Sequence, residues 1–179
     1  MSQPGPPVTP QPALRTVRLV VGAMGVALLV IALAWAFVVP FAAPPLVAVV
    51  AVLLAAALAA ALLSRQGRRV EPLPAGMPAD RARDRATAVF QSSLMLRAAF
   101  AEIPAFVAIA LSVALRPGSW WTLALGVAVG LVLLGLFVWP RPEGIDRLAS
   151  ALEAQGTPSS LRETFGVPAR GPYDAPPSG

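Results

Sequence analysis

"LVAVVAVLLAAALAAALL", residues 46–63, is an uninterrupted run of apolar side chains without a single charged or hydroxyl group. A helix of about 20 mainly apolar residues crosses the hydrocarbon core of a bilayer, and a run of about 18 is already a candidate. Three further runs of comparable length cover approximately residues 19–39, 93–115 and 120–139. The sequence therefore predicts an all-α fold: an integral membrane bundle of four transmembrane helices.

The composition supports this fold class and removes most catalytic chemistry. Hydrophobic residues make up 56% of the 179 residues and charged residues 13%, whereas soluble domains carry about 25% charged residues. The chain has no Cys and no His, which excludes disulfides, thiolate or imidazole metal ligands, and Cys- or His-dependent catalysis. We expect a protein that is not an enzyme and has no catalytic residues, metal ligands or cofactor.

The basic residues indicate the orientation in the membrane. All 14 are Arg, and 12 of them lie in the N-terminal segment, in residues 64–92 or after residue 140. Residues 40–45 carry no charge, and residues 116–119 carry only Arg116. The positive-inside rule then predicts a multi-pass protein of the cytoplasmic (plasma) membrane, with both termini and the loop 64–92 in the cytoplasm. The arginines form no recognisable nucleic-acid-binding module, so the expected partner is the lipid bilayer and not nucleic acid.

Small residues in the apolar runs predict close helix packing, because they let backbones approach each other in lipid. The short connections at residues 40–45 and 116–119 predict two tight hairpins, in which the first and second spans, and the third and fourth, are antiparallel neighbours. A further partner is then a second copy of the chain in a homo-oligomer, or another subunit of a membrane complex. The candidate packing residues are Gly22, Gly25, Ala48, Ala51, Ala55, Ala59, Gly126 and Gly130.

The segments outside the apolar runs divide into disordered and helical parts. Residues 1–14 are rich in Pro and, like residues 167–179, are expected to be disordered. Within the loop 64–92 the first half contains turn-forming residues, and Asp80 is a candidate N-cap for a charged helix that continues into the third run.

Residues 141–166 predict short amphipathic helices. Ile145, Leu148 and Leu152 recur at helical spacing, and Gly156 follows as a stop signal. This apolar stripe has two possible positions, on the membrane surface or against the loop 64–92. Ser160 and Glu163 have the spacing of a capping box for a further helical turn.

The stretch "RAAFAEIPAFV", residues 97–107, carries the one acid found inside an apolar run. At about 1.5 Å per residue, Arg97 lies roughly 6 Å and Glu102 roughly 13 Å into the run that starts at Ser93. Arg97 can extend to the interface, whereas a carboxyl group at the depth of Glu102 should be buried between helices and either neutral or paired. The two residues lie on different faces of the helix, so we expect no direct bond between them.

Two interpretations of Glu102 remain open at this point. Pro104 removes the helical hydrogen bond of the Phe100 carbonyl and predicts a kink, so a neutral Glu102 can satisfy a freed carbonyl in a purely structural role. The alternative is a site for a proton or cation. "LMLRAAFAEIPAFVAIALSVAL" (94–115), preceded by "AALLSRQGRR" (60–69), resembles the carboxylate-bearing helix and polar loop of ATP synthase proteolipid (c) subunits. This resemblance implies that Glu102 is a proton-carrying acid.

A second resemblance covers more of the chain. The A-x-A-E-x-P-A pattern at residues 99–105 and "WPRPEGIDRLASAL" (139–152) are similar to sequences of small, uncharacterised bacterial four-span membrane proteins of actinobacterial type. The resemblance implies the four-span architecture and no particular activity. From the sequence we expect a non-enzymatic accessory, assembly or scaffold protein, with a proton- or cation-translocating subunit as the alternative.

Overall fold

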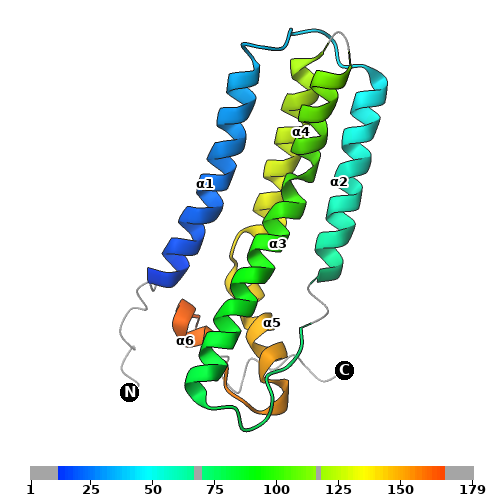
Figure 1. Cartoon of the computed structure of the whole chain (residues 1–179). Coiled ribbons are helices and arrows are strands. Elements are labelled where there is room, and N and C mark those ends of the chain that lie inside the picture. The colour runs from blue at the N-terminus through cyan, green and yellow to red at the C-terminus, as the bar shows by residue number, and fades with distance from the viewer. Residues whose placement is uncertain (1–11, 67–69, 116–117, 168–179) are drawn as a thin grey trace, which may run out of the picture. The chain divides into compact units, whose positions relative to one another are not determined.

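The computed structural model describes residues 12–66, 70–115 and 118–167, and all regular secondary structure in these ranges is helical (Figure 1). The long helices are α1 (Pro12–Trp35), α2 (Leu46–Gln66), α3 (Ala79–Ala114) and α4 (Trp120–Leu133), and a π-helical segment, η1 (Leu134–Val138), extends α4. The short ones are α5 (Pro142–Leu152), the 3₁₀ turn η2 (Glu153–Gln155) and α6 (Leu161–Phe165). Four helices are long and apolar enough to cross a membrane. The predicted all-α fold with four such helices is confirmed.

The chain forms two compact units. The apolar unit comprises Arg18–Arg69 and Gln91–Trp139. The amphipathic unit comprises Met1–Val17, Val70–Phe90 and Pro140–Gly179. Helix α3 contributes to both units, because its 36 residues extend over about 54 Å, whereas the hydrocarbon core of a bilayer is about 30 Å thick.

Within the apolar unit, α4 is the helix onto which the others pack. A Cβ added at Gly126 would meet Ala108 of α3, and a Cβ added at Gly25 of α1 would lie 3.4 Å from the side chain of Leu131. Helix α2 also packs against α4. The largest buried share of any of the four candidate spans accordingly belongs to the one formed by α4 and η1.

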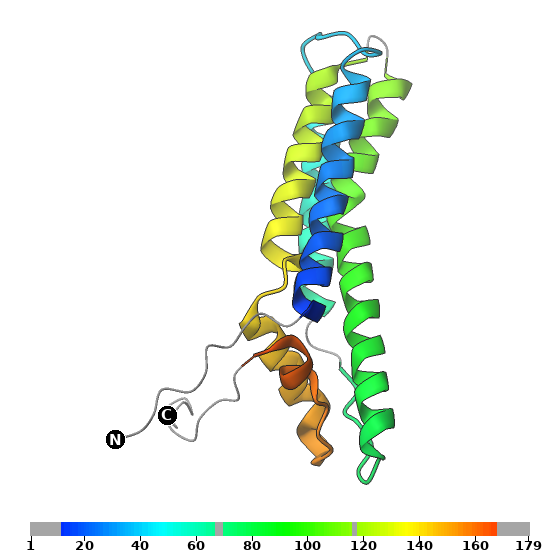
Figure 2. The same cartoon turned by 90° about the vertical axis from the view of Figure 1, so that its left-hand side faces the viewer.

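The two hairpins are antiparallel but differ in how closely their helices lie. Helices α3 and α4 touch directly. Helices α1 and α2 stand on opposite sides of the α3–α4 pair in Figure 1, and in Figure 2 α1 (blue) stands in front of that pair and α2 (cyan) behind it. Residues 36–45, which connect α1 to α2, are long enough to bridge the pair. The prediction that the first two spans are neighbours is therefore wrong, because α3 and α4 lie between α1 and α2. The third and fourth spans are neighbours, as predicted.

The turns at one end of the apolar unit are joined by hydrogen bonds. The backbone N–H of Trp120 donates to the carbonyl of Pro40 (3.0 Å), and the Ser119 hydroxyl donates to the carbonyl of Ala42 (2.6 Å). The indole Nε1 of Trp120 donates to the carbonyl of Ala32 (3.1 Å), near the end of α1. These bonds satisfy backbone groups where a helix end would otherwise leave them unpaired.

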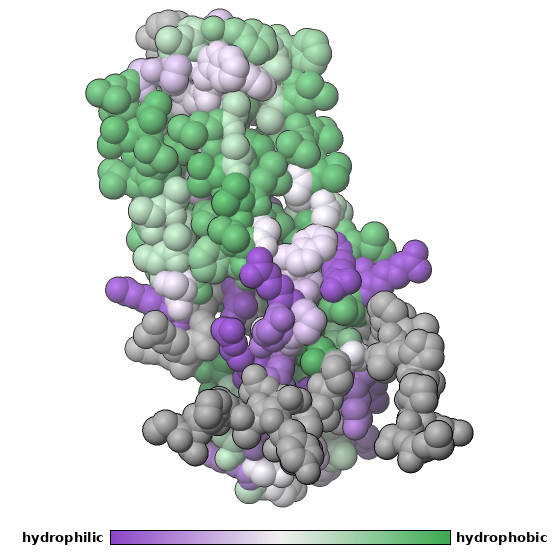
Figure 3. Space-filling model, turned by 180° about the vertical axis from the view of Figure 1, so that it is seen from behind, coloured by the Kyte–Doolittle hydropathy of each residue, from purple (hydrophilic) through white to green (hydrophobic). Residues whose placement is uncertain are grey.

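The surface of the apolar unit is hydrophobic. Every exposed large hydrophobic side chain among the described residues belongs to this unit, and Figure 3 shows such side chains as a continuous green area over its helices. Water-soluble proteins seldom expose contiguous apolar areas above a few hundred square ångströms. The four apolar helices and this surface indicate a multi-pass membrane protein.

The amphipathic unit has a conventional core. Its buried side chains come from the start of α3, from α5 and α6, and from the segments between them, and they are Leu14, Leu73, Ala82, Ala86, Phe90, Ile145, Ala149, Leu152, Leu161 and Phe165. The rings of Phe90 and Phe165 lie 4.5 Å apart. The apolar stripe of α5 therefore packs against residues 70–90. Of the two positions that the sequence left open, the membrane surface and the loop 64–92, the structure shows the second.

Several details differ from the sequence-based predictions. Helix α1 starts at Pro12, inside the stretch predicted to be disordered, since Pro is well suited to the first helical position. Asp80 lies within the first turn of α3 and not before it. Ser160 makes no side-chain capping bond, because its backbone is left-handed with φ 53°; the predicted capping box with Glu163 is wrong. Gly156 does end the helical segment, with a φ of 85° that suits Gly.

Some predictions concern residues outside the described ranges. The expected disorder of residues 1–11 and 168–179 falls there, as do Arg68, Arg69, Arg116 and Arg170, four of the arginines used to predict the orientation.

Candidate functional site

Glu102 lies at the boundary between the buried and the exposed faces of α3. Ala101 and Ala105 are fully buried, whereas Met95 and Phe106 are 53% and 57% exposed. The side chain of Glu102 is itself partly exposed, and within the described chain it takes part in no hydrogen bond or ion pair. The sequence predicted a carboxyl group buried between helices. The structure places it at the edge instead, because each residue turns the helix by about 100° away from the α4-facing Ala101.

Arg97 lies on the α4-facing side of the same helix. It precedes Ala101 by four residues and Pro104 by seven, and residues at these spacings share a helix face. Its Nε is buried without a hydrogen-bond partner in the part of the chain that the structure describes. Arg97 and Glu102 form no ion pair, so the structure does not bring these two predicted site residues together.

Pro104 belongs to the contact between α3 and α4. The residue is fully buried, and α3 continues through it to Ala114. A Cβ added at Gly126 would lie 2.7 Å from the Pro104 carbonyl oxygen and 2.3 Å from the Cβ of Ala108. Only Gly fits at position 126 without moving a backbone, so Pro104 presents its carbonyl to a glycine of the neighbouring helix.

The other small residues differ in what they contact. A Cβ at Gly130 would lie 3.2 Å from the Ala101 carbonyl oxygen, whereas one at Gly22 would meet nothing within 4 Å. In α2, Ala48 and Ala59 are fully buried. Ala51 and Ala55, from the same predicted stripe, are only partly buried. The tightest of these predicted packing positions is therefore Gly126.

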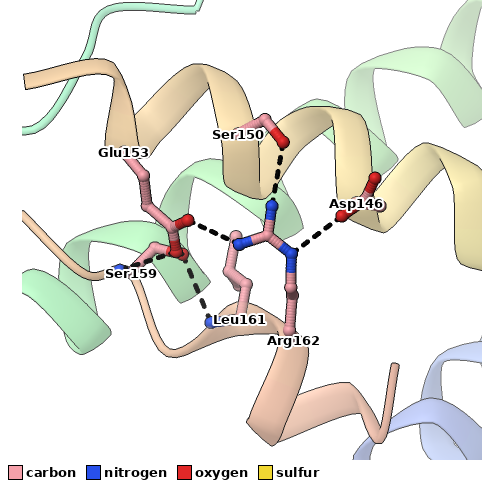
Figure 4. A network of polar contacts seen from close by, with 6 residues as sticks. All are labelled: Asp146, Ser150, Glu153, Ser159, Leu161 and Arg162. Carbon is pink, nitrogen blue, oxygen red and sulfur yellow. Dashed lines mark hydrogen bonds and ion pairs between the residues drawn. The ribbon is translucent and has the colours of Figure 1, made fainter. Parts of the chain in front are cut away.

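A polar cluster in the amphipathic unit has no counterpart among the predicted site residues. Arg162 of α6 donates through Nε to Asp146 (2.8 Å), through one terminal nitrogen to Ser150 (2.8 Å), and through the other to Glu153 (Figure 4). Glu153 also accepts from the hydroxyl (2.7 Å) and the backbone N–H (3.1 Å) of Ser159. We call these five residues the Arg162 clasp, since they connect residues 159–162 to α5 and to η2. The sequence feature that could have predicted this cluster is the spacing of Asp146, Ser150 and Glu153, which places them on one helix face.

The clasp affects the ionisation of its members. Burial by itself would raise the pKa of Glu153, but the hydrogen bonds from Ser159 and Arg162 and the positive charge of Arg162 outweigh it and lower that pKa. The hydrogen bond to Asp146, with further support from Glu153, raises the pKa of Arg162. Both side chains are therefore charged near neutral pH.

The chemistry that these sites allow is limited. Among the described residues no three acidic, His or Cys side chains come together as a metal site. In the described part of the chain Glu102 has no hydrogen bond or ion pair to a base or a nucleophile, which a catalytic set would need. Its carboxyl group can exchange a proton or bind a cation.

No family model, curated protein or solved structure matches the chain.

Proposed function

We propose that this chain is a non-enzymatic accessory, assembly or scaffold protein of the cytoplasmic membrane, with both termini on the cytoplasmic side. One observation carries the proposal: among the described residues, all exposed large hydrophobic side chains lie in the apolar unit, while the amphipathic unit buries a core of its own. An apolar unit embedded in the membrane, continuous in the chain with a folded amphipathic unit, suits a protein that binds partners at a membrane. The sequence, with no Cys and no His, supports a role without chemistry.

The partner-binding role is tested by crosslinking in native membranes, followed by purification of the chain and identification of crosslinked proteins. We expect a defined partner at a fixed ratio, or a second copy of the chain. Glu102→Gln should leave this complex intact, and Gly126→Leu should disrupt it because the substitution separates α3 from α4. Gly22→Leu is the matched control, since a Cβ at this glycine meets no other atom within 4 Å. A chain that yields no crosslinked species in any membrane preparation contradicts the proposal.

The orientation is tested separately by cysteine labelling, which is direct because the natural chain has no Cys. Ala43 lies between α1 and α2 and Ala154 in η2, and both are exposed. In intact cells a membrane-impermeant maleimide should label Ala43→Cys and leave Ala154→Cys unlabelled until the membrane is permeabilised. The reverse pattern would place the termini outside.

The second candidate function is proton or cation translocation through Glu102. The specific observation is a carboxyl group within an apolar helix that is partly exposed and has no partner in the described chain. A hydrophobic carbodiimide should then modify the wild-type chain more rapidly at low pH, since it reacts with the protonated acid, and should not modify Glu102→Gln at this position. Lack of labelling at any pH excludes this function.

A further inference from the structure

Two arginines of the apolar unit carry a buried donor that the described chain does not satisfy. They are Arg18 of α1 and Arg97 of α3, and in each the Nε atom is buried without a hydrogen-bond partner among the described residues. The ion pairs found in the described ranges both belong to Arg162, in the other unit. A buried donor on a charged group is costly when it is left unpaired. These two guanidinium groups therefore favour an anion that the described chain does not supply.

Both arginines continue the helix faces that pack onto α4. Arg18 precedes Gly25 by seven residues, and Gly25 is the position of α1 that faces Leu131. Arg97 precedes Ala101 by four residues, and the Ala101 carbonyl faces α4 as well. These spacings keep each arginine on the same face as the residue that follows it. Both arginines therefore lie on the side of their helix that faces α4.

The two arginines also lie toward the same end of the apolar unit. Leu28 and Ala101 mark one level of the bundle, because both lie within 4 Å of a Cβ placed at Gly130. Helices α1 and α3 run in the same direction in Figures 1 and 2. Counted back along each helix at about 1.5 Å per residue, Arg97 lies roughly 6 Å and Arg18 roughly 15 Å from that level. The interval of about 9 Å between them is slightly larger than the thickness of a polar headgroup layer, on the order of 5–8 Å per leaflet, and a long arginine side chain can extend over the difference.

The unit itself offers almost no negative charge to these arginines. Glu102 is the only acid in residues 18–69 and 91–139. It lies on a different face of α3 from Arg97, and five residues separate the two along the helix, about 7.5 Å. Glu102 forms no ion pair with Arg97, and the ion pairs of the described residues involve neither of them. The anion must come from the surroundings, and phosphate groups are the anions that a membrane presents at this depth.

We propose that Arg18 and Arg97 form a binding site for the headgroup phosphate of an anionic phospholipid. A guanidinium group suits this ligand because its planar donors pair with two phosphate oxygens at once. Two unpaired positive charges favour a lipid with net negative charge over a zwitterionic one. The inference rests on the membrane placement proposed above, but it is independent of any accessory or translocation role.

The test uses the full chain reconstituted in vesicles of phosphatidylcholine, with or without phosphatidylglycerol. Tight association is read out by native mass spectrometry of lipid that stays bound after gentle extraction. We expect the wild-type chain to retain phosphatidylglycerol in preference to phosphatidylcholine. Arg18→Gln and Arg97→Gln should each weaken this preference by about tenfold, the change expected from losing charge-assisted hydrogen bonds. The double variant should have no preference.

Arg65→Gln is the matched control, since Arg65 lies in the last turn of α2 in the same unit but is exposed and has no buried unpaired atom. It removes the same charge and should leave the preference nearly unchanged. Circular dichroism of each variant shows whether it is folded, and Arg97→Lys, which retains the charge without the fork geometry, should bind with intermediate strength.

Three outcomes overturn the inference. A wild-type chain that retains both lipids equally has no anionic site, and an equal loss in Arg65→Gln means that total charge decides the preference. If inorganic phosphate alone, at the same concentration as the lipid, displaces the retained phosphatidylglycerol from the purified chain, the ligand is free phosphate and not a lipid. Failure of the chain to enter the vesicles at all contradicts the membrane placement instead, so the two proposals fail in distinguishable ways.

Discussion

The apolar unit and the amphipathic unit are both helical, but different forces stabilise them. In the apolar unit the tightest contacts are made by glycines and alanines such as Gly126 and Gly130, and many large hydrophobic side chains are exposed, although others such as Leu123 are fully buried. In the amphipathic unit large side chains such as Leu73, Leu152 and Phe165 are buried. Lipid is as apolar as a leucine side chain, so burying one leucine between helices stabilises a membrane protein only slightly. The fit between the helix backbones therefore determines how stably the helices pack. In water the same burial is the main driving force.

The largest effect should come from the amphipathic core. Leu152→Ala removes a fully buried side chain and should destabilise this unit by about 3 kcal/mol, from lost burial and the cavity left behind. Hydrogen exchange of the chain in micelles should show faster exchange in residues 142–165. The control is Leu136→Ala, at a position 55% exposed in the apolar unit, which should change exchange very little. Equal effects of the two substitutions would remove the distinction between the units.

The next effect concerns the glycine contact of the apolar unit. Gly126→Ala places a methyl group 2.3 Å from the Ala108 Cβ and 2.7 Å from the Pro104 carbonyl oxygen. The helices must separate, at a cost of about 2 kcal/mol, and thermal unfolding in micelles should occur at a lower temperature. Gly22→Ala, with open space around the added methyl group, should be neutral or slightly stabilising. If both variants behave alike, backbone fit does not decide the stability of this unit.

A smaller effect is expected for the Arg162 clasp. Arg162→Ala removes the hydrogen bonds to Asp146, Ser150 and Glu153, and the side chain is partly solvent-accessible. We expect a loss of about 1 kcal/mol, seen as faster hydrogen exchange in residues 159–165 and less pronounced at high salt. Arg147→Ala is the control, because Arg147 is an exposed arginine of α5. A loss of the same size in both variants would show that the clasp geometry contributes nothing.

The smallest effect is a dependence on pH. The pKa of Glu153 is lowered in the folded chain, so its contribution to stability is complete above about pH 4.3, the usual pKa of an unfolded Glu. The contribution is lost as the pH falls through the folded pKa, which lies below that value. Hydrogen exchange of residues 157–165 should therefore show acid destabilisation in the wild type and less of it in Glu153→Gln. An unchanged pH profile in this variant would assign the effect to other carboxylates.

The helices of the apolar unit were predictable because the thickness of a bilayer imposes a strict length on an apolar run. Helix α2 begins at Leu46, where the sequence placed the second span. Helix α1 ends at Trp35 instead of Val39, since residues 36–39 form the turn toward α2. The charged helix expected after Asp80 is present as the first part of α3.

The contacts were harder to predict than the helices. Gly22 and Gly25 look alike in the sequence, yet only Gly25 approaches another helix. The rotation of each helix about its axis determines which glycine faces a neighbouring helix, and this rotation cannot be predicted clearly from a long apolar run. For the same reason the edge position of Glu102 was missed, and its functional role stays a prediction. The clasp was missed because the left-handed backbone of Ser160, which brings Arg162 toward Asp146, has no signature in a non-glycine residue.

The central position of α4 has a consequence for how the protein is made. A ribosome delivers the spans in chain order, and α4 is the last of the four to emerge. Helices α1, α2 and α3 all contact it, so they must wait in the bilayer with their packing surfaces facing lipid or the insertion machinery. The bundle then closes in one late step, when Gly126 and Gly130 arrive.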